Sequence, residues 1–395
     1  MQTSAERRVE LDWIRIGAFG LLILYHVGMY YTTWDWHVKS PWRSRALDVV
    51  MLWSNPWRLG LLFLVAGAAT RFMSERYAPA RLARSRSARL LLPLLFGMLV
   101  IVPPQSYLEV VEKLGYADGF AAFYARYLAA DGSFCPAQRC IILPTWNHLW
   151  FVAYLWAYTM LAAAALAARP GLIGGAERIL ARLLAGPGLF LAPVATLAAA
   201  RLVLHPVFGS THALIDDWYN HAVFLPLLAL GFLLARDARF WARVEAARWM
   251  ALGLALASYA AIAASYGAFG TSSPAHGAMH AVMRVVYGVD QWAWIVAILG
   301  FGRRFLSEAD GPARRYLTDA IFPCYIVHQT VVIVLAHHLE PYALPVAAEV
   351  AINLAATIAA GFAAYEIARR LSPMRPWFGL KPALGNSGPA YGGAS

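Results

Sequence analysis

Residues 11–31 read LDWIRIGAFGLLILYHVGMYY, a stretch that is long enough and apolar enough to cross a bilayer. A spanning α-helix needs about 20 mostly apolar residues. This one also carries Arg15 and His26, and ionisable side chains are costly inside a membrane. Because both interrupt the apolar run and no small-residue cleavage site follows, we expect a permanent helix rather than a signal peptide.

The whole chain has the composition of a membrane protein. Hydrophobic residues make up 60% of its 395 residues and charged residues 14%, whereas an ordinary soluble domain has about 25% charged residues. The apolar content continues from Leu11 to Leu371 without a soluble-looking block. We therefore expect one transmembrane domain over residues 1–371, followed by a flexible cytoplasmic tail over residues 372–395 that is rich in Gly, Pro and Ala.

Apolar runs of spanning length recur along the chain. They occupy residues 11–33, 46–70, 90–106, 143–168, 188–207, 218–235, 249–268, 285–302, 317–337 and 342–368. The sequence therefore predicts an all-α fold, a polytopic bundle of about ten transmembrane helices.

Basic residues alternate between the two sides of this predicted bundle. With the N-terminus in the cytoplasm, 23 Lys and Arg fall on the cytoplasmic side and six on the other, with four Arg left within the spans. Such an asymmetry is typical of cytoplasmic loops, so both termini should lie in the cytoplasm. The net charge of +11 is spread over short loop clusters, so we expect a lipid bilayer, and not nucleic acid, as the partner.

The three cysteines indicate no metal site. Cys135 and Cys140 lie close together in a polar loop and could form a disulfide if that loop is outside the cytoplasm. Idle thiols are the next alternative, and a metal site is the last, because the local sequence offers too few further ligands. Cys324 lies in an apolar run and is expected to be core.

Polar residues inside the predicted spans indicate a polar interior groove. Ionisable groups there cost about 2.5 kcal/mol or more each, so they face the bundle interior and usually mark function. They are Asp12, Arg15, His26, Asp48, Arg58, His148, Arg201, Arg284, Asp290, His328 and Glu349.

Arg15 and His26 should share one face of the first span. Eleven residues correspond to about three turns and about 16 Å along a helix. A cation at the cytoplasmic mouth and an imidazole deeper in one groove would suit coenzyme A, with phosphates outside and a thioester inside. His26 would then be a general base. Alternatively His26 is a hydrogen-bonded core residue and Arg15 extends to the interface. Asp12, one turn earlier, would orient or neutralise Arg15.

Four further motifs contain candidate ligand-binding residues. RSRSAR (84–89) leads into the third span, where Arg86 and Arg89 would hold phosphates or serve only as a topology signal. TWNHLWF (145–151) contains His148 and could be an interfacial belt. DDWYNH (216–221), with Asp216 and Asp217, has the character of a carbohydrate-contacting loop or a solvated one. YIVHQT (325–330) places His328 and Gln329 inside the ninth span, where both need partners.

These motifs together resemble the acyltransferase-3 family of integral membrane acyltransferases. Arg15 and His26 match the family's Arg and His separated by ten residues, and Arg86 and Arg89 match its Arg-x-x-Arg. FLVAGAATRF (63–72) has Ala66-Gly67 where the family commonly has Ser-Gly, and HLWF and YIVHQT are also similar to family segments. The resemblance runs from about residue 10 to residue 370.

The resemblance implies an O-acyltransferase of the bacterial inner membrane. Its donor would be cytoplasmic acyl-CoA, either succinyl-CoA or acetyl-CoA, held by Arg15, Arg86 and Arg89. Its acceptor would be a hydroxyl of a periplasmic or cell-envelope glycan, such as a glucan. The catalytic group would comprise His26, Arg15 and Asp12. Substrate-binding candidates are His148, Asp216, Asp217, His328 and Gln329.

Two other classes of protein remain compatible with the residues alone. A transporter or flippase for an anionic lipid or glycan could use the same polar groove without chemistry. A non-catalytic membrane scaffold is disfavoured, because it has no need for so many buried ionisable groups.

Overall fold

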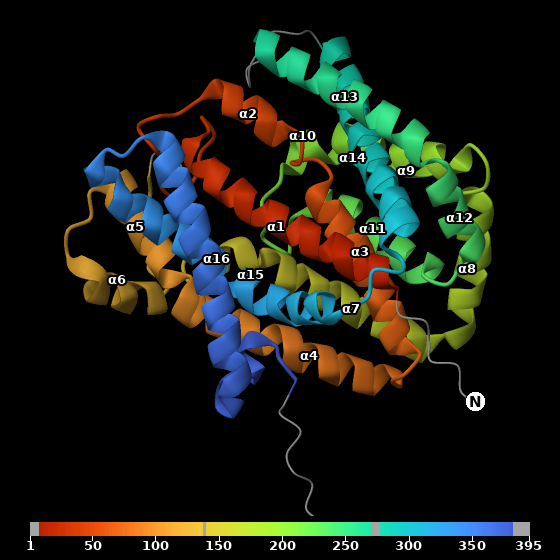
Figure 1. Ribbon diagram of the computed structural model, residues 1–395, viewed down its shortest axis with the longest axis horizontal. Coiled ribbons are helices and arrows are strands. Elements are labelled where there is room, and N and C mark those ends of the chain that lie inside the picture. Colours follow the sequence, from red (N-terminus) through yellow and green to blue (C-terminus); the bar gives the residue numbers. More distant parts are fainter. Residues whose placement is uncertain (1–7, 137–139, 270–276, 382–395) are drawn as a thin grey trace, which may run out of the picture.

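The computed structural model describes residues 8–136, 140–269 and 277–381, and within these ranges it contains helices and no strands (Figure 1). The α-helices are α1 (Val9–Tyr31), α2 (Arg45–Leu52), α3 (Arg58–Ser74), α4 (Pro79–Phe96), α5 (Pro103–Leu114), α6 (Gly119–Leu128), α7 (Trp150–Ala168), α8 (Pro170–Leu183), α9 (Gly188–Ala199), α10 (His205–Phe208), α11 (Trp218–Leu234), α12 (Ala238–Ala246), α13 (Arg248–Phe269), α14 (Gly277–Leu306), α15 (Pro312–Leu339) and α16 (Val346–Arg370). The predicted all-α bundle is confirmed.

The number of spans differs from the predicted ten. Eight helices of the described chain are long and apolar enough to cross a membrane, or nine if the bent pair α11 and α12 is one span. Each predicted range contains a helix, but α3 and α11 have 17 residues each, about 26 Å, which is the lower end of the spanning range. The predicted second span is broken because Pro56 separates α2 from α3.

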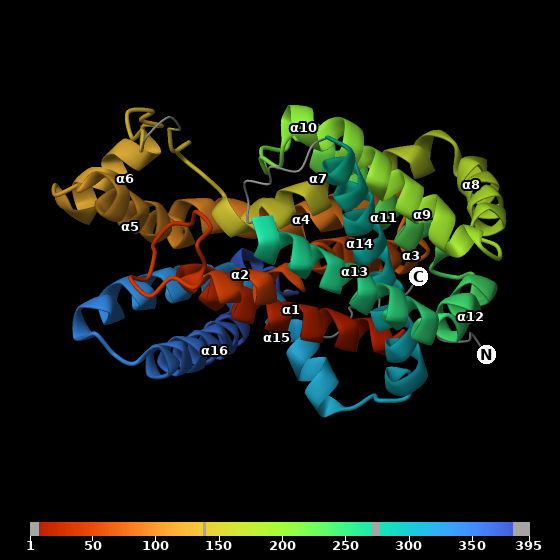
Figure 2. The same ribbon diagram turned by 90° about the horizontal axis from the view of Figure 1, so that it is seen from above.

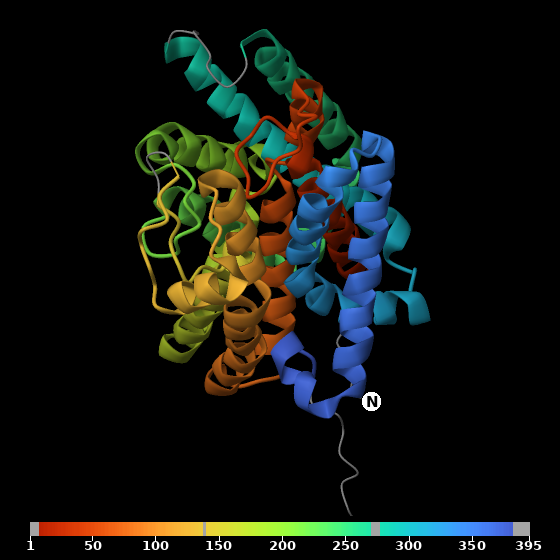
Figure 3. The ribbon, with the colours of Figure 1, turned by 90° about the vertical axis from the view of Figure 1, so that its left-hand side faces the viewer.

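The helices are arranged as a bundle around α1, α3 and α11. Figure 1 shows α1 crossing the middle of the molecule, between α3 on one side and α15 on the other. Seen from above in Figure 2, α5 and α6 project at one end, and α8 and α12 lie at the other. Figure 3 shows α16, in blue, along the outer edge. The peripheral helices thus enclose a central group that could hold a site.

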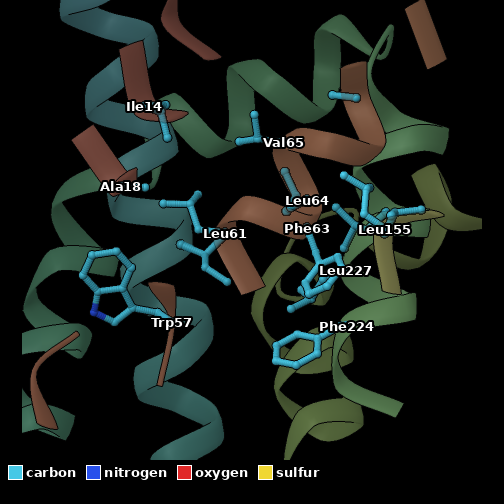
Figure 4. Close-up of a cluster of buried hydrophobic side chains, with 14 of the residues drawn as sticks. Ile14, Ala18, Trp57, Leu61, Phe63, Leu64, Val65, Leu155, Phe224 and Leu227 are labelled. Atoms are coloured by element: carbon cyan, nitrogen blue, oxygen red, sulfur yellow. The ribbon is translucent and has the colours of Figure 1, made fainter. Parts of the chain in front are cut away.

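The central helices approach each other closely. A Cβ on Gly67 of α3 would lie 2.0 Å from the Leu228 carbonyl oxygen of α11, and one on Gly231 would lie 1.9 Å from that of Leu64. Small residues at such crossings let helix backbones pack together inside a membrane. Phe63 of α3 stacks on Phe224 of α11, and Figure 4 shows this cluster.

Apolar and polar residues are distributed as in a membrane protein. Trp249, Met250 and Leu256 of α13 are exposed, whereas Asp290 and Gln291 of the neighbouring α14 are buried. In lipid, apolar side chains can face outward while polar groups must find partners inside the bundle. Together with the apolar helices, this pattern describes a multi-pass membrane protein with a polar interior.

Two loop features bear on the earlier predictions. Cys135 and Cys140 form a disulfide. Residues 372–381, at the start of the predicted tail, form two short 3-10 turns in which Phe378 is buried against Phe96. The packed chain therefore extends about ten residues past the predicted boundary. Residues 382–395 lie outside the described ranges, as does Arg139, one of the six basic residues on the predicted outer side.

Candidate active site

A cavity of about 980 Å³ lies inside the bundle, lined by residues of α1, α3, α4, α7, α11, α14, α15 and α16. Ten Arg and Lys side chains line it, against two carboxylates, Asp12 and Asp319. A surplus of positive charge between low-dielectric walls concentrates anions. The predicted polar groove is therefore present, and it suits a ligand with several negative charges.

The three arginines predicted to hold a donor meet at this cavity. Arg15 comes from α1, whereas Arg86 and Arg89 lie one turn apart on α4. Arg86 donates to Thr70 Oγ1 at 2.8 Å, and its buried Nε has no hydrogen-bond partner among the described residues. Arg89 donates through Nε to the Gly379 carbonyl at 3.2 Å. The remaining guanidinium N–H groups are the kind of donors that phosphates accept.

Asp12 belongs to the same end of the cavity. It accepts from Arg15 at 3.5 Å and forms a second, shorter ion pair with the buried Arg314 of α15. Asp12 precedes His26 by 14 residues, or about 21 Å of helix. It is thus placed to orient Arg15 and to join α1 to α15, at a distance from the imidazole.

Arg15 and His26 line the same cavity, as the sequence predicts. The helix α1 is unbroken from Val9 to Tyr31, and both side chains are among the lining residues. Their eleven-residue separation corresponds to about 16 Å along the axis. An elongated ligand could therefore contact both side chains at once.

His26 is hydrogen-bonded to a second histidine. Its Nδ1 lies 2.9 Å from Nε2 of His328 on α15, and Nδ1 of His328 lies 2.7 Å from the Tyr325 carbonyl oxygen. A carbonyl only accepts hydrogen bonds, so His328 carries its proton on Nδ1. Nε2 of neutral His328 then accepts from the Nδ1–H of His26. This arrangement of hydrogen bonds leaves a free lone pair on Nε2 of His26, which is the form that a general base requires.

His148 lies beside this pair and connects it to a polar network. Its ring centroid is 5.0 Å from that of His328, and its Nε2 lies 3.1 Å from the Ile326 carbonyl. Gln105 donates to His148 Nδ1 at 3.4 Å and accepts from Gln329 at 3.0 Å. His148 lines the cavity, whereas the buried Gln329 supports the wall behind it.

The network continues from Gln329 to residues that the sequence did not single out. Gln329 donates to His37 Nε2 at 3.1 Å, and His37 Nδ1 lies 2.5 Å from Glu109. Within the described ranges, no group of three or more His, Cys, Asp or Glu side chains is arranged to hold a metal ion.

The two aspartates of DDWYNH have different surroundings. Asp217 is fully buried and accepts from Tyr154 OH at 2.6 Å, from Asn220 at 2.7 Å and from the backbone N–H of His212 at 2.8 Å. It therefore fixes the loop that carries His212, a cavity-lining residue. Asp216 is exposed and is absent from the cavity lining.

Arg58 and Arg201 also line the cavity, in keeping with the expectation that ionisable residues within the spans face the bundle interior. Arg58 begins α3 directly after the break at Pro56. Arg201 lies in a π-helical turn, Ala200–Leu204, that precedes Pro206. A proline clashes with the carbonyl four residues earlier, and a wider turn relieves that clash. The proline signals and the inward direction were predictable from the sequence, but the partners of the two side chains were not.

Comparisons with known proteins show the family of this chain. The family described as an acyltransferase domain matches residues 8–366. Glucans biosynthesis protein C of Salmonella heidelberg (strain SL476) is 23% identical over 399 residues, 96% of each chain. The protein of that name from Escherichia coli (strain 536) is 27% identical over 157 residues, 40% of this chain and 38% of that one. No solved structure matches the chain significantly.

The family match covers nearly the whole chain and extends from α1 into α16. Arg15 and His26, which line one cavity, both lie within the matched residues. The chain belongs to the acyltransferase-3 family of membrane acyltransferases.

Proposed function

We propose that this protein is an O-acyltransferase that moves a succinyl or acetyl group from cytoplasmic acyl-CoA to a hydroxyl of a periplasmic or cell-envelope glycan. The observation that carries the proposal is that His26, hydrogen-bonded to His328 behind it, lines the same cavity as Arg15, Arg86 and Arg89. The acceptor class follows the relatives, which are named for glucan biosynthesis.

In this proposal the donor lies along the cavity with its phosphates against Arg86 and Arg89. The cavity is long enough for a pantetheine arm, because Arg15 and His26 are about 16 Å apart on one helix. Charge-assisted hydrogen bonds from guanidinium to phosphate are among the strong ones in proteins. They would fix the position of the thioester relative to His26.

The transfer step uses His26 as an acid–base catalyst. Its Nε2 takes the proton of the acceptor hydroxyl while the hydroxyl oxygen attacks the thioester carbonyl carbon. The tetrahedral intermediate then collapses, the C–S bond breaks, and the same proton passes from His26 to the departing thiolate. The products are the ester of the acceptor and the free thiol of the donor, so that all atoms are accounted for.

His328 is a positioning residue in this step. By accepting the Nδ1–H of His26 at 2.9 Å, it keeps Nε2 unprotonated and fixes the orientation of the ring. An imidazolium formed on His26 keeps the same hydrogen bond. Among the substrate-binding candidates that the sequence indicates, His148 lines the cavity and is proposed to contact substrate. Three others, His328, Gln329 and Asp217, are proposed to support residues of the cavity wall through hydrogen bonds. The exposed Asp216 stays a candidate for acceptor binding.

In this proposal the protein lies in a bacterial inner membrane with both termini in the cytoplasm. It crosses the membrane ten times, and α3 and α11 are counted among the ten spans. The supports for this orientation are the 23-to-6 distribution of Lys and Arg and the Cys135–Cys140 disulfide in a loop on the opposite side. The orientation places Arg86 and Arg89 at the cytoplasmic mouth, where acyl-CoA is available.

Labelling of single cysteines tests this orientation. In a variant with the three native cysteines replaced by Ser, Ala117→Cys and Glu308→Cys each add one exposed thiol. An impermeant maleimide added to intact spheroplasts should label position 117 and leave position 308 unlabelled until the membrane is opened. Labelling of position 308 from outside would overturn the orientation.

The rival reading, a transporter or flippase using the same cavity, predicts no chemistry. Purified protein in nanodiscs should release free thiol from succinyl-CoA or acetyl-CoA when a glucan acceptor is present, at a rate that rises with protein concentration. We expect acyl ester to appear on the acceptor in equal amount. Movement of acceptor across vesicles without thiol release would favour transport instead.

A further inference from the structure

The cavity has a second cationic region that the donor's phosphates would not occupy. Arg58 of α3 is 4% exposed and lines the cavity, and its buried Nε has no hydrogen-bond partner among the described residues. One neutral oxygen, Ser54 Oγ at 3.3 Å, accepts from its Nη1. No carboxylate forms an ion pair with Arg58 within the described part of the chain. A buried guanidinium in this state needs an anion.

Arg201 is held in a matching way on the other side of the same region. Its guanidinium lies 3.4 Å from the ring centroid of Tyr287, as that of Arg58 lies 3.5 Å from the ring centroid of Tyr25. Arg201 also donates to Tyr219 OH at 2.8 Å, again a neutral partner. Stacking on an aromatic face fixes a guanidinium without neutralising it.

One amide joins the two stacked pairs into a single unit. Asn55 donates to Tyr25 OH at 2.7 Å and accepts from Tyr287 OH at 2.9 Å. Asn55, both tyrosines and both arginines line the cavity. The two cations are therefore held by one hydrogen-bonded frame around the same open space.

This region is separate from the proposed phosphate site. Arg86 is hydrogen-bonded to Thr70, which lies twelve residues after Arg58 on the unbroken helix α3, a distance of about 18 Å along its axis. Tyr25, on which Arg58 stacks, is the neighbour of His26, and their rings are 6.0 Å apart. The second cationic region thus lies at the level of the reacting groups.

We infer that Arg58 and Arg201 form a second anion-binding site, which takes a carboxylate or phosphate group of the reactants next to His26. The inference rests on the proposed function, because the bound anion is a group of the proposed donor or acceptor. The anion has two available sources, the free carboxylate of a dicarboxylic acyl group and an acidic group on the acceptor. Both present the same chemistry to the two guanidinium groups.

Binding of small anions to the purified full-length protein tests the site without turnover. Succinate and glucose 6-phosphate are the probes, and at least one should bind. Arg58→Gln and Arg201→Gln should each weaken that binding about tenfold or more, as expected for a lost charge-assisted bond. Arg58→Lys, which keeps the charge, should retain part of it. Arg45→Gln is the matched control, because Arg45 also stacks on a tyrosine but is exposed outside the cavity.

The source of the anion is decided by matched pairs of ligands. If it is the acyl carboxylate, succinyl-CoA should bind more tightly than acetyl-CoA, and Arg58→Gln should abolish the difference. If it belongs to the acceptor, the two donors should bind equally, and glucose 6-phosphate should bind more tightly than glucose until either arginine is replaced. Binding of both probes that is independent of Arg58 and Arg201 would overturn the inference. Because these measurements need no thiol release, its failure is distinguishable from failure of the proposed function.

Discussion

Replacing His26 with Ala should reduce turnover by about 10²–10⁴-fold, the usual contribution of a positioned acid–base group. Donor affinity should change little, because the arginines proposed to hold the phosphates meet around Arg15, which is about 16 Å from His26 along α1. The variant should insert normally, since His26 is partly exposed to the cavity and an alanine fits a helix. Steady-state kinetics of thiol release, with a separate measurement of acyl-CoA binding, would separate the two effects.

Two other histidines on α15 complete this experiment. His338→Ala is the matched control, because His338 is exposed and its hydrogen bond goes to the Val334 carbonyl of its own helix, so the kinetics of this variant should be unchanged. His328→Ala removes the acceptor of the His26 Nδ1–H and should lower kcat with KM nearly constant. His328→Gln keeps a side-chain acceptor and should recover part of the rate. Near-normal turnover in His26→Ala would show that His26 is a core residue and that the mechanism is wrong.

Replacing Arg86 and Arg89 together with Gln should weaken acyl-CoA binding by about 10²-fold or more, since each charge-assisted contact contributes about 1.5–3 kcal/mol. The effect should be on the donor's Kd and KM, with acceptor binding preserved. The measurement is equilibrium binding of acyl-CoA and of a glucan to the same purified variant.

Arg84 provides the matched control for this pair. It lies on the same turn of α4 but is exposed and does not line the cavity, so Arg84→Gln should bind acyl-CoA as the unmodified protein does. An equal loss of donor and acceptor binding in the double variant would indicate disturbed insertion. Unchanged donor binding would show that Arg86 and Arg89 are not part of the donor site.

Geometry within one helix was predictable from the sequence. Arg15 and His26 share a cavity because a rise of 1.5 Å and a turn of 100° per residue fix their relation once α1 forms. Apolar length and Arg-rich loops likewise located a helix in each predicted range. These features depend on local composition, which a single sequence contains.

Relations between helices were not predictable in the same way. His26 and His328 are 302 residues apart, and their contact depends on how α1 and α15 rotate against each other. The sequence therefore grouped His328 with substrate-binding residues, whereas the structure places it behind His26. Asp217 similarly proved to be a buried acceptor for its own loop, because Tyr154 from α7 reaches it.

The prolines at the helix breaks could be recognised in the sequence, and so could the inward direction of Arg58 and Arg201, but not the partners that these side chains meet. Pro56 shortens the predicted second span, and the new helix begins with Arg58 pointing into the cavity. Pro206 accompanies the π-helical turn that carries Arg201. A proline predicts a break and an ionisable residue in a span predicts an inward direction, but the groups that surround it depend on the packing of the neighbouring helices.

The most direct test of the central claim is a structure of the full-length protein bound to a non-hydrolysable thioether analogue of acyl-CoA. Our account predicts phosphates against Arg86 and Arg89 and the reacting carbon about 5 Å from His26 Nε2, which leaves room for a hydroxyl oxygen at about 3 Å from the imidazole. Binding of the analogue outside the cavity, or with its reacting carbon far from His26, would contradict it.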